Sequence, residues 1–279
     1  MKPSISSCYL KNLNAYEMVK AFSDWGYDCT EINEAHYLPF LDGGEDVRAY
    51  RRYIDGLGFS IPQGHLVFGE QAHISVADHT AAVDRLKRNL DVFLELGVKA
   101  AVLHYGSCGT DVLPIEDYFD YRVAALNELT AYVKGTDLSI CIENLSRLHD
   151  YDATHILSMC RAVDNQENIG ICLDTGHLNI SQNGDPYTFI EQAGAYLKAM
   201  HVHDNRGEQH GLQGSACDWH IMPFGGGNIR WERVKRGVKD FSYAGLFSYE
   251  LGNSGIPMEI KAIQAKYLLE VYRTYFDFA

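Results

Sequence analysis

Eight short apolar runs recur along the chain, and each is followed by a segment whose apolar residues have helical spacing. The expected strands cover residues 4–9, 27–32, 59–64, 100–103, 138–142, 169–173, 199–202 and 244–249. Short unbroken apolar runs are typical of strands buried on both faces. Because strands that alternate with helices form parallel sheets, eight such units favour a closed (β/α)8 TIM barrel over an open doubly wound sheet.

Capping signals bound several of the expected helices. Asn14 precedes a helix over 15–25, and Asp185 followed by Pro186 predicts an N-cap with proline at the first helical position. Ser75 with Asp78 resembles a capping box, and Asn228 is expected to cap a helix to residue 238. The other expected helices cover 45–56, 114–133, 153–163 and 257 to about 272. With no linker in the pattern, residues 1–279 are expected to form one barrel domain.

Composition narrows the class of protein. The chain has 279 residues, 46% of them hydrophobic and 22% charged, as in ordinary soluble enzymes. There is neither a membrane-spanning apolar run nor a signal-peptide core at the N-terminus, and the seven scattered cysteines lack CxxC spacing. We therefore expect a cytoplasmic protein. A net charge of −13 disfavours nucleic acid as a partner, and the sequence has no GxGxxG or Walker motif.

Polar residues close six of the expected strands. In a (β/α)8 barrel the chemistry lies at the C-terminal ends of the strands, so these side chains should converge on one small volume. They are His65, His104, Glu143, Asp174, His201 and Glu250. Crowded carboxylates repel one another and are costly to bury, and a divalent cation removes both problems. Mixed carboxylate and imidazole ligands suit Mn, Zn, Fe and Co, and suit Mg less well.

Three further segments lie next to these strand ends. His203 follows His201 on the same side of one strand, because residues two apart share a face. Asp218 and His220 occupy the following loop, and a glycine-rich turn at 223–229 leads into a helix. That turn has two interpretations, a tight loop with an N-cap or backbone that approaches a substrate such as a phosphate. Each single histidine also has an ordinary structural explanation, so the functional interpretation rests on the ordered set of strand-end residues.

The ordered motifs resemble the xylose isomerase-like TIM barrel superfamily, which includes sugar (phosphate) isomerases and epimerases and endonuclease IV. The resemblance covers nearly the whole chain. It is carried by Glu143-Asn144, Asp174-Thr175-Gly176-His177, His201-Val202-His203-Asp204, Asp218-Trp219-His220 and Glu250.

The resemblance implies a role for each matching residue. It implies that one divalent metal ion (Mn, Zn, Co or Mg) is held by Glu143, Asp174, His201 and Glu250. Glu143 and Glu250 also match the acid/base pair, and His203 is a rival to His201 as ligand. The residues expected to bind substrate or to orient the ligands are His65, His104, His177, His203, Asp218 and His220.

The function implied is a metal-dependent sugar (phosphate) isomerase or epimerase of carbohydrate metabolism, acting by proton transfer next to a metal-bound carbonyl. Related dehydratases begin with the same step. The alternative is an endonuclease IV-like zinc phosphodiesterase acting on abasic DNA, for whose three zinc ions this chain has nine candidate ligands. A barrel that only binds a ligand is the third interpretation. The acidic balance and the lack of a basic, aromatic loop after the first two strands favour a small sugar substrate.

Several properties stay open at this point. The sequence does not specify the sugar, its stereochemistry or phosphorylation, the metal, or the number of ions. A homo-oligomer is compatible with the fold, because barrel enzymes are often symmetric oligomers. Further residues that are candidates to line the pocket are Glu31, Asn33, Arg147, Arg206 and Trp231.

Overall fold

The strands form one parallel eight-stranded sheet in the order β1-β8-β7-β6-β5-β4-β3-β2. This computed structural model describes residues 1–41, 43–106, 115–145, 152–181, 184–207, 217–252 and 255–277. The strands are β1 Lys2–Ile5, β2 Cys29–Ile32, β3 Ser60–His65, β4 Ala100–Leu103, β5 Ser139–Glu143, β6 Ile169–Asp174, β7 Leu197–Val202 and β8 Leu246–Tyr249. A single parallel bridge from Ser6 to Glu31 joins the two ends of the sheet.

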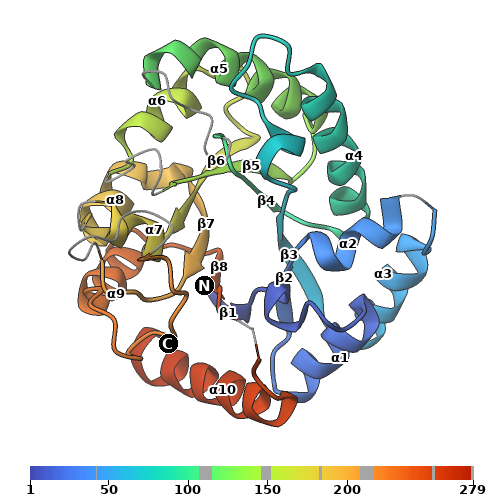
Figure 1. Cartoon of the computed structure of the whole chain (residues 1–279), viewed down its shortest axis with the longest axis vertical. Coiled ribbons are helices and arrows are strands. Elements are labelled where there is room, and N and C mark those ends of the chain that lie inside the picture. Colours follow the sequence, from blue (N-terminus) through green and yellow to red (C-terminus); the bar gives the residue numbers. More distant parts are fainter. Residues whose placement is uncertain are drawn as a thin grey trace.

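Helices surround this sheet on the outside, so the predicted (β/α)8 TIM barrel is confirmed (Figure 1). Their bounds are α1 Ala15–Asp24, α2 Glu34–Leu41, α3 Val47–Gly56, α4 Thr80–Leu96, α5 Ile115–Tyr132, α6 Thr154–Ala162, α7 Thr175–Ile180, α8 Pro186–Ala193, α9 Trp231–Asp240 and α10 Met258–Val271. Short 3-10 turns lie at Ser7–Leu10, Gly69–Ala72 and Gly194–Tyr196, and a π-helical turn at Tyr272–Phe276 follows α10. None of the described helices is long and apolar enough to cross a membrane.

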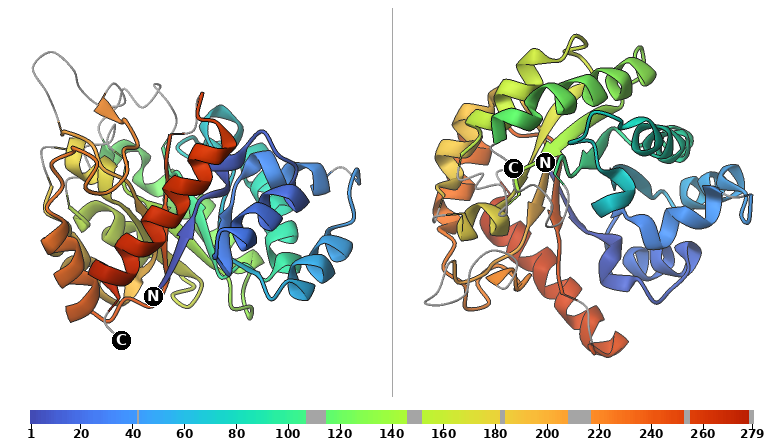
Figure 2. Two further views of the ribbon diagram at one scale, coloured as in Figure 1. Left: turned by 90° about the horizontal axis from the view of Figure 1, so that it is seen from below. Right: turned by 45° about the horizontal axis from the view of Figure 1, so that its top comes forward.

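The last helix, α10, lies beside the first strand and completes the ring (Figure 2). The hydroxyl of Tyr272 donates to the carbonyl oxygen of Met1 over 2.9 Å, and the hydroxyl of Tyr9 donates to Gln264 on α10. These bonds join the N-terminal segment to the C-terminal helix.

Most buried apolar residues fill the layer between the strands and the helices, but a small separate cluster fills the barrel itself. This inner cluster consists of Ala100, Val102, Cys141, Cys172 and Ala199. Successive side chains of a strand point to opposite faces, so the residues between these positions face the helices. The small inner side chains suit a narrow interior, and the two cysteines are buried there as small apolar residues.

Local capping signals are confirmed at two helices. At α1, Asn14 Oδ1 accepts from the N–H of Glu17 while the Glu17 carboxylate accepts from the N–H of Asn14, which is a complete capping box. At α8, the Asp185 carboxylate accepts from the N–H of Thr188 and Pro186 occupies the first turn. The sequence alone was sufficient at these ends because both partners lie within four residues.

Two expected caps are wrong. The helix predicted near Ser75 begins at Thr80, and the Ser75 hydroxyl instead donates to the carbonyl of Tyr105. The helix predicted from Asn228 begins at Trp231, because the Asn228 side-chain oxygen, the atom that would cap it, accepts from Asn179 Nδ2, while its amide nitrogen donates to a carbonyl in the loop after β7. In both cases a partner distant in sequence takes the side chain. Helices α2 and α7 were not expected, and β1 ends at Ile5 where a strand to residue 9 was predicted.

Candidate metal centre

Strand periodicity directs the predicted site residues into the barrel. Side chains two positions apart share a face, so a residue two positions after a member of the inner cluster also points inward. Glu143, Asp174 and His201 each stand in this relation to the cluster members on β5, β6 and β7. His104 stands in the same relation to Val102 on β4. The apolar interior thus gives way to polar side chains at the C-terminal ends of the strands.

Four residues at the C-terminal ends of the strands form one compact cluster. One possible ligand atom from each of Glu143, Asp174, His201 and Glu250 lies within 4.8 Å of the others. His201 Nδ1 faces all three carboxylates, at 3.3 Å from Glu143, 3.8 Å from Asp174 and 3.4 Å from Glu250. Glu250 is the most accessible of the four, with 20% of its side chain exposed.

The electrostatics of this cluster fit a divalent cation. Three carboxylates converge on one imidazole. Burial and the Glu143 carboxylate raise the pKa of Asp174, but His177 and His203 hold it below its ordinary value. Burial lowers the pKa of His201, but the surrounding acidic groups, including Glu143 and Glu250, raise it well above its ordinary value. Mixed carboxylate oxygen and imidazole nitrogen donors are a ligand set for Mn, Fe, Co or Zn. The residues present therefore fit the predicted metal.

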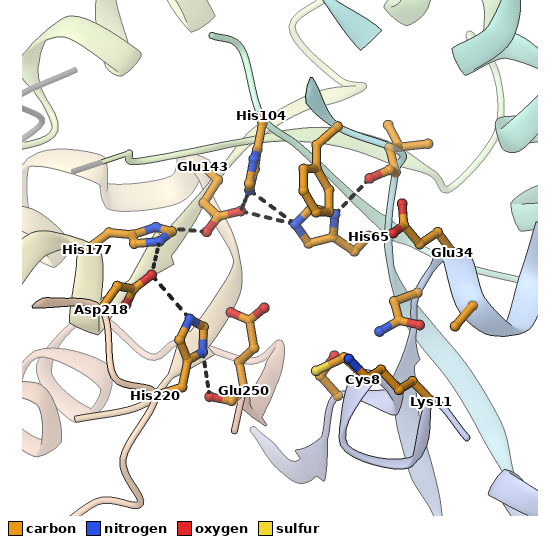
Figure 3. Close-up of a pocket in the computed structure, with 15 residues that line it drawn as sticks. Cys8, Lys11, Glu34, His65, His104, Glu143, His177, Asp218, His220 and Glu250 are labelled. Atoms are coloured by element: carbon orange, nitrogen blue, oxygen red, sulfur yellow. Dashed lines mark hydrogen bonds and ion pairs between the residues drawn. The ribbon is translucent and has the colours of Figure 1, made fainter. Parts of the chain in front are cut away.

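Glu143 also connects the cluster to a second group of imidazoles. Its Oε2 lies 2.9 Å from His104 Nε2 and 3.4 Å from His65 Nε2, and its Oε1 lies 3.2 Å from His177 Nδ1. Burial alone raises the pKa of Glu143, but the charges of His104 and His201 hold it well below the ordinary value. Glu143 is thus held as a carboxylate between two sets of side chains, of which Figure 3 shows His65, His104 and His177.

Asp218 connects the remaining histidines. Its Oδ2 lies 3.3 Å from His177 Nε2 and 3.2 Å from His220 Nε2. The His203 ring stacks on His220 at a centroid distance of 3.9 Å, and His203 Nε2 lies 3.0 Å from Asp174 Oδ1. Burial lowers the pKa of His220, but Asp218 and nearby carboxylates raise it to about 9. His203 therefore supports Asp174, while His201 faces the carboxylate cluster.

A cavity of about 380 Å³ opens above these residues. Its polar wall includes Glu143, His177, Asp218, His220 and Glu250, with His65 and His104 beside them (Figure 3). Residues that the sequence did not single out also line it, namely Ser6, Cys8, Lys11, Glu34, Ala35, Leu66 and Phe68. They lie in the segments after β1, β2 and β3, where neither periodicity nor a motif marks them.

The additional pocket candidates fall into separate groups. Asn33 lines the cavity, and Glu31 lies beneath it in contact with His201. Arg206 lies over the Trp219 ring and Trp231 donates to Asp204, and neither lines this cavity. Arg147 lies outside the described residues.

The glycine-rich turn has a structural explanation. A Cβ atom on Gly227 would lie 2.0 Å from Asp204 Oδ1, so only glycine lets the turn pass this carboxylate. Asp204 accepts from the backbone N–H groups of Asn205 and Ile229 and from Trp231 Nε1, which ties the turn to the loop after β7. No described residue of the turn lines the cavity above the carboxylates.

Two curated proteins match part of the chain. The probable endonuclease 4 of Mycoplasma pneumoniae is 27% identical over 167 residues, which are 56% of this chain and 55% of that protein. The probable endonuclease 4 of Ureaplasma urealyticum serovar 10 is 29% identical over 126 residues, 40% of each chain. The chain thus spans about half or less of the length of these relatives.

Solved structures resemble the whole chain. A D-psicose 3-epimerase crystallised in the presence of D-fructose is 16% identical and covers 99% of each chain with a TM-score of 0.81. A D-tagatose 3-epimerase-like protein is 21% identical, covering 99% of this chain and 98% of its own, with a TM-score of 0.78. The IOLI protein with a bound zinc atom is 20% identical, covering 99% and 100%, with a TM-score of 0.81. At these identities the likeness shows the fold.

The family comparison covers almost all of the barrel. A family model described as xylose isomerase-like TIM barrel matches residues 19–273, from within α1 to the turn after α10. The chain belongs to the xylose isomerase-like TIM barrel family.

Proposed function

We propose that this chain is a divalent-metal-dependent isomerase or epimerase acting on a small sugar, keto-sugar, polyol or sugar phosphate. The observation that supports it is the cluster of Glu143, Asp174, His201 and Glu250, whose ligand atoms lie within 4.8 Å of one another below a cavity of about 380 Å³. The cavity volume falls in the range of small-molecule sites. Structural neighbours named as sugar 3-epimerases support the same class of substrate.

The four clustered residues would hold the metal ion, which would act as a Lewis acid on a substrate carbonyl. Glu143 and Glu250 then act as the acid/base pair. A carboxylate oxygen of one takes the proton from the carbon next to the carbonyl, and the other returns a proton to the neighbouring position or to the opposite face. Glu250 is suited to contact substrate because it comes from the end of β8 and keeps part of its side chain exposed in the cavity.

The remaining side chains position the substrate. His177, Asp218 and His220 line one wall and offer both donors and acceptors for sugar hydroxyls. Phe68 packs against His104 at a ring-centroid distance of 5.0 Å and covers the imidazoles from solvent.

The proposal is tested by proton exchange. Glu143→Gln and Glu250→Gln are expected to abolish incorporation of deuterium from D₂O into keto-sugars, followed by NMR on a panel of free and phosphorylated sugars. Glu34→Gln is the matched control, because Glu34 lines the cavity outside the four-residue cluster. Full activity in both the Glu143→Gln and the Glu250→Gln variants would refute the mechanism. A product that lacks one water relative to the substrate would reassign the enzyme as a dehydratase, which begins with the same proton abstraction.

A zinc phosphodiesterase acting at abasic DNA is the second candidate function. It is favoured by the convergence of nine candidate ligands and by the partial match to proteins named probable endonuclease 4. The nine are His65, His104, Glu143, Asp174, His177, His201, Asp218, His220 and Glu250. Against it, Lys11 is the only Lys or Arg among the described residues that line the cavity, and the chain carries a net charge of −13.

Metal content separates the two candidates. Elemental analysis of protein purified without chelator is expected to give close to one divalent ion per chain for the isomerase. Close to three zinc ions, with cleavage of an abasic-site duplex, would replace the leading proposal with the phosphodiesterase.

A further inference from the structure

Glu31, at the end of β2, is a buried carboxylate that the mechanism above does not use. Its side chain is 1% exposed. Its Oε1 lies 2.7 Å from His201 Nε2, and its Oε2 accepts from the Ser248 hydroxyl over 2.8 Å. Glu31 is therefore held from two neighbouring elements of the barrel, β7 and β8.

The two nitrogens of the His201 ring have different surroundings. Nε2 makes the short contact with Glu31, whereas Nδ1 faces Glu143, Asp174 and Glu250 at 3.3 to 3.8 Å. A carboxylate oxygen only accepts, so the nitrogen closest to Glu31 is the one that carries hydrogen. In the neutral ring this leaves the lone pair on Nδ1, directed at the three carboxylates.

Packing restricts the ring as well. The His65 ring stacks on His201 at a centroid distance of 5.5 Å and an interplanar angle of 13°, and His201 is 1% exposed. Rotating the ring by half a turn about the Cβ–Cγ bond would put Cε1 where Nε2 lies, which would remove the donor from Glu31 and leave a buried carboxylate oxygen without a partner. Within the described chain, Glu31 has no Lys or Arg partner that could compensate. The hydrogen bond and the stacking thus select one ring orientation.

We infer that Glu31 is the positioning residue of the metal centre: it fixes His201 as the Nε2–H tautomer, so that Nδ1 is the ligand atom. The inference rests on the metal site of the proposed function. Retaining a buried carboxylate beside a histidine that faces three other carboxylates is costly. That cost is explained when the negative charge of Glu31 increases the basicity of Nδ1 toward a cation, as carboxylates behind ligating histidines do.

The tautomer is tested first in the unaltered protein. Long-range ¹H–¹⁵N correlation spectra of protein labelled with ¹⁵N-histidine, with His201→Gln used to assign the ring, report which nitrogen carries hydrogen after addition of Zn²⁺. We expect hydrogen on Nε2 and the zinc-shifted resonance on Nδ1. A ring that carries its hydrogen on Nδ1 would overturn the inference, and this experiment does not depend on a Glu31 variant that folds.

Metal affinity is the second measurement. Glu31→Gln keeps the side-chain shape and removes the charge, and we expect its affinity for Zn²⁺ and Mn²⁺, measured by competition with a chelator, to fall about 10- to 100-fold. Glu34→Gln, which removes a carboxylate from the cavity wall without touching His201, is expected to bind as the unaltered protein does. An affinity of Glu31→Gln within about twofold of the unaltered protein would refute the inference.

These readouts are independent of the reaction. If Glu31→Gln loses metal affinity while no sugar in the panel is turned over, the role of Glu31 stands and the proposed function fails. If sugars are turned over and Glu31→Gln binds metal normally, the proposed function stands and the role of Glu31 fails.

Discussion

Gly176 lies where the backbone of α7 meets the His203 ring, and replacing it by alanine should disrupt the site. A Cβ atom there would lie 1.9 Å from His203 Cε1 and 2.4 Å from Nδ1. The ring cannot retreat easily, because it stacks on His220 at 3.9 Å and its Nε2 lies 3.0 Å from Asp174 Oδ1. Glycine is therefore required here because the His203 ring lies too close for a side chain. Backbone strain is not the reason, since Gly176 has a helical conformation.

The magnitude follows from the displacement. An ordinary Cβ contact begins at 3.4 Å, so His203 must move by roughly 1.5 Å from its position 1.9 Å away. Overpacking of this kind costs about 1–3 kcal/mol. Losing the hydrogen bond to the Asp174 carboxylate adds about 1.5–3 kcal/mol. We expect Gly176→Ala to lower the free energy of unfolding by about 3–5 kcal/mol and to weaken metal binding, because Asp174 loses a partner.

Urea unfolding of the metal-free protein measures this change, with metal affinity determined in parallel. Gly56→Ala is the matched control, since a Cβ atom at this last residue of α3 meets nothing within 4 Å. The control is expected to be neutral or to stabilise by up to about 1 kcal/mol. A Gly176→Ala variant that unfolds within about 1 kcal/mol of the unaltered protein would show that His203 moves without cost, and the reasoning would fail.

Three further changes have expected outcomes. Chelation should lower the unfolding temperature in calorimetry, and Mn²⁺ or Zn²⁺ at about 100 times its Kd should restore about 2.7 kcal/mol; an unchanged temperature would contradict a bound metal. Asp185→Ala removes the N-cap of α8 and should cost about 0.5–2 kcal/mol at pH 7. Hydrogen bonds from Arg233 lower the pKa of Asp185 in the folded protein, so this contribution is complete only above the unfolded-state pKa of about 4 and is lost as the pH falls from there through the folded-state pKa. Urea titrations from about pH 7 to about pH 2 should show the stability difference shrinking below about pH 4, and a constant difference would refute the assignment. Asp218→Asn should leave close to one metal ion per chain by elemental analysis, and a loss of bound ions would place a metal at Asp218.

The parts of the site that could be predicted are those fixed by strand periodicity. Glu143, Asp174 and His201 follow apolar runs whose inward positions are set two residues apart, so their convergence depends only on the barrel closing. Closure in turn depends on eight repeated units, which the sequence displays directly. The same logic placed His104 correctly at the end of β4.

Contacts between distant segments could not be predicted in this way. The bond from Glu31 to His201 joins residues 170 positions apart, and it depends on how far β2 extends relative to β7. Lys11 and Phe68 reach the cavity from segments with no periodic pattern. Asn228 was expected to cap α9 because its local sequence fits, but its side-chain oxygen accepts from Asn179, 49 positions away, instead.

Glu143 belongs to the four-residue cluster and also contacts the imidazoles of His65, His104 and His177, so its substitution disturbs both groups. Its Oε1 faces His201 and His177, while its Oε2 faces His104 and His65. A change at Glu143 therefore disturbs a site with one ion and a site with several ions alike. Only residues outside the cluster of three carboxylates and one imidazole separate the two arrangements. His104 makes its contact with the cluster through Oε2 of Glu143, so substituting it changes the number of bound ions only when a second ion lies on that side.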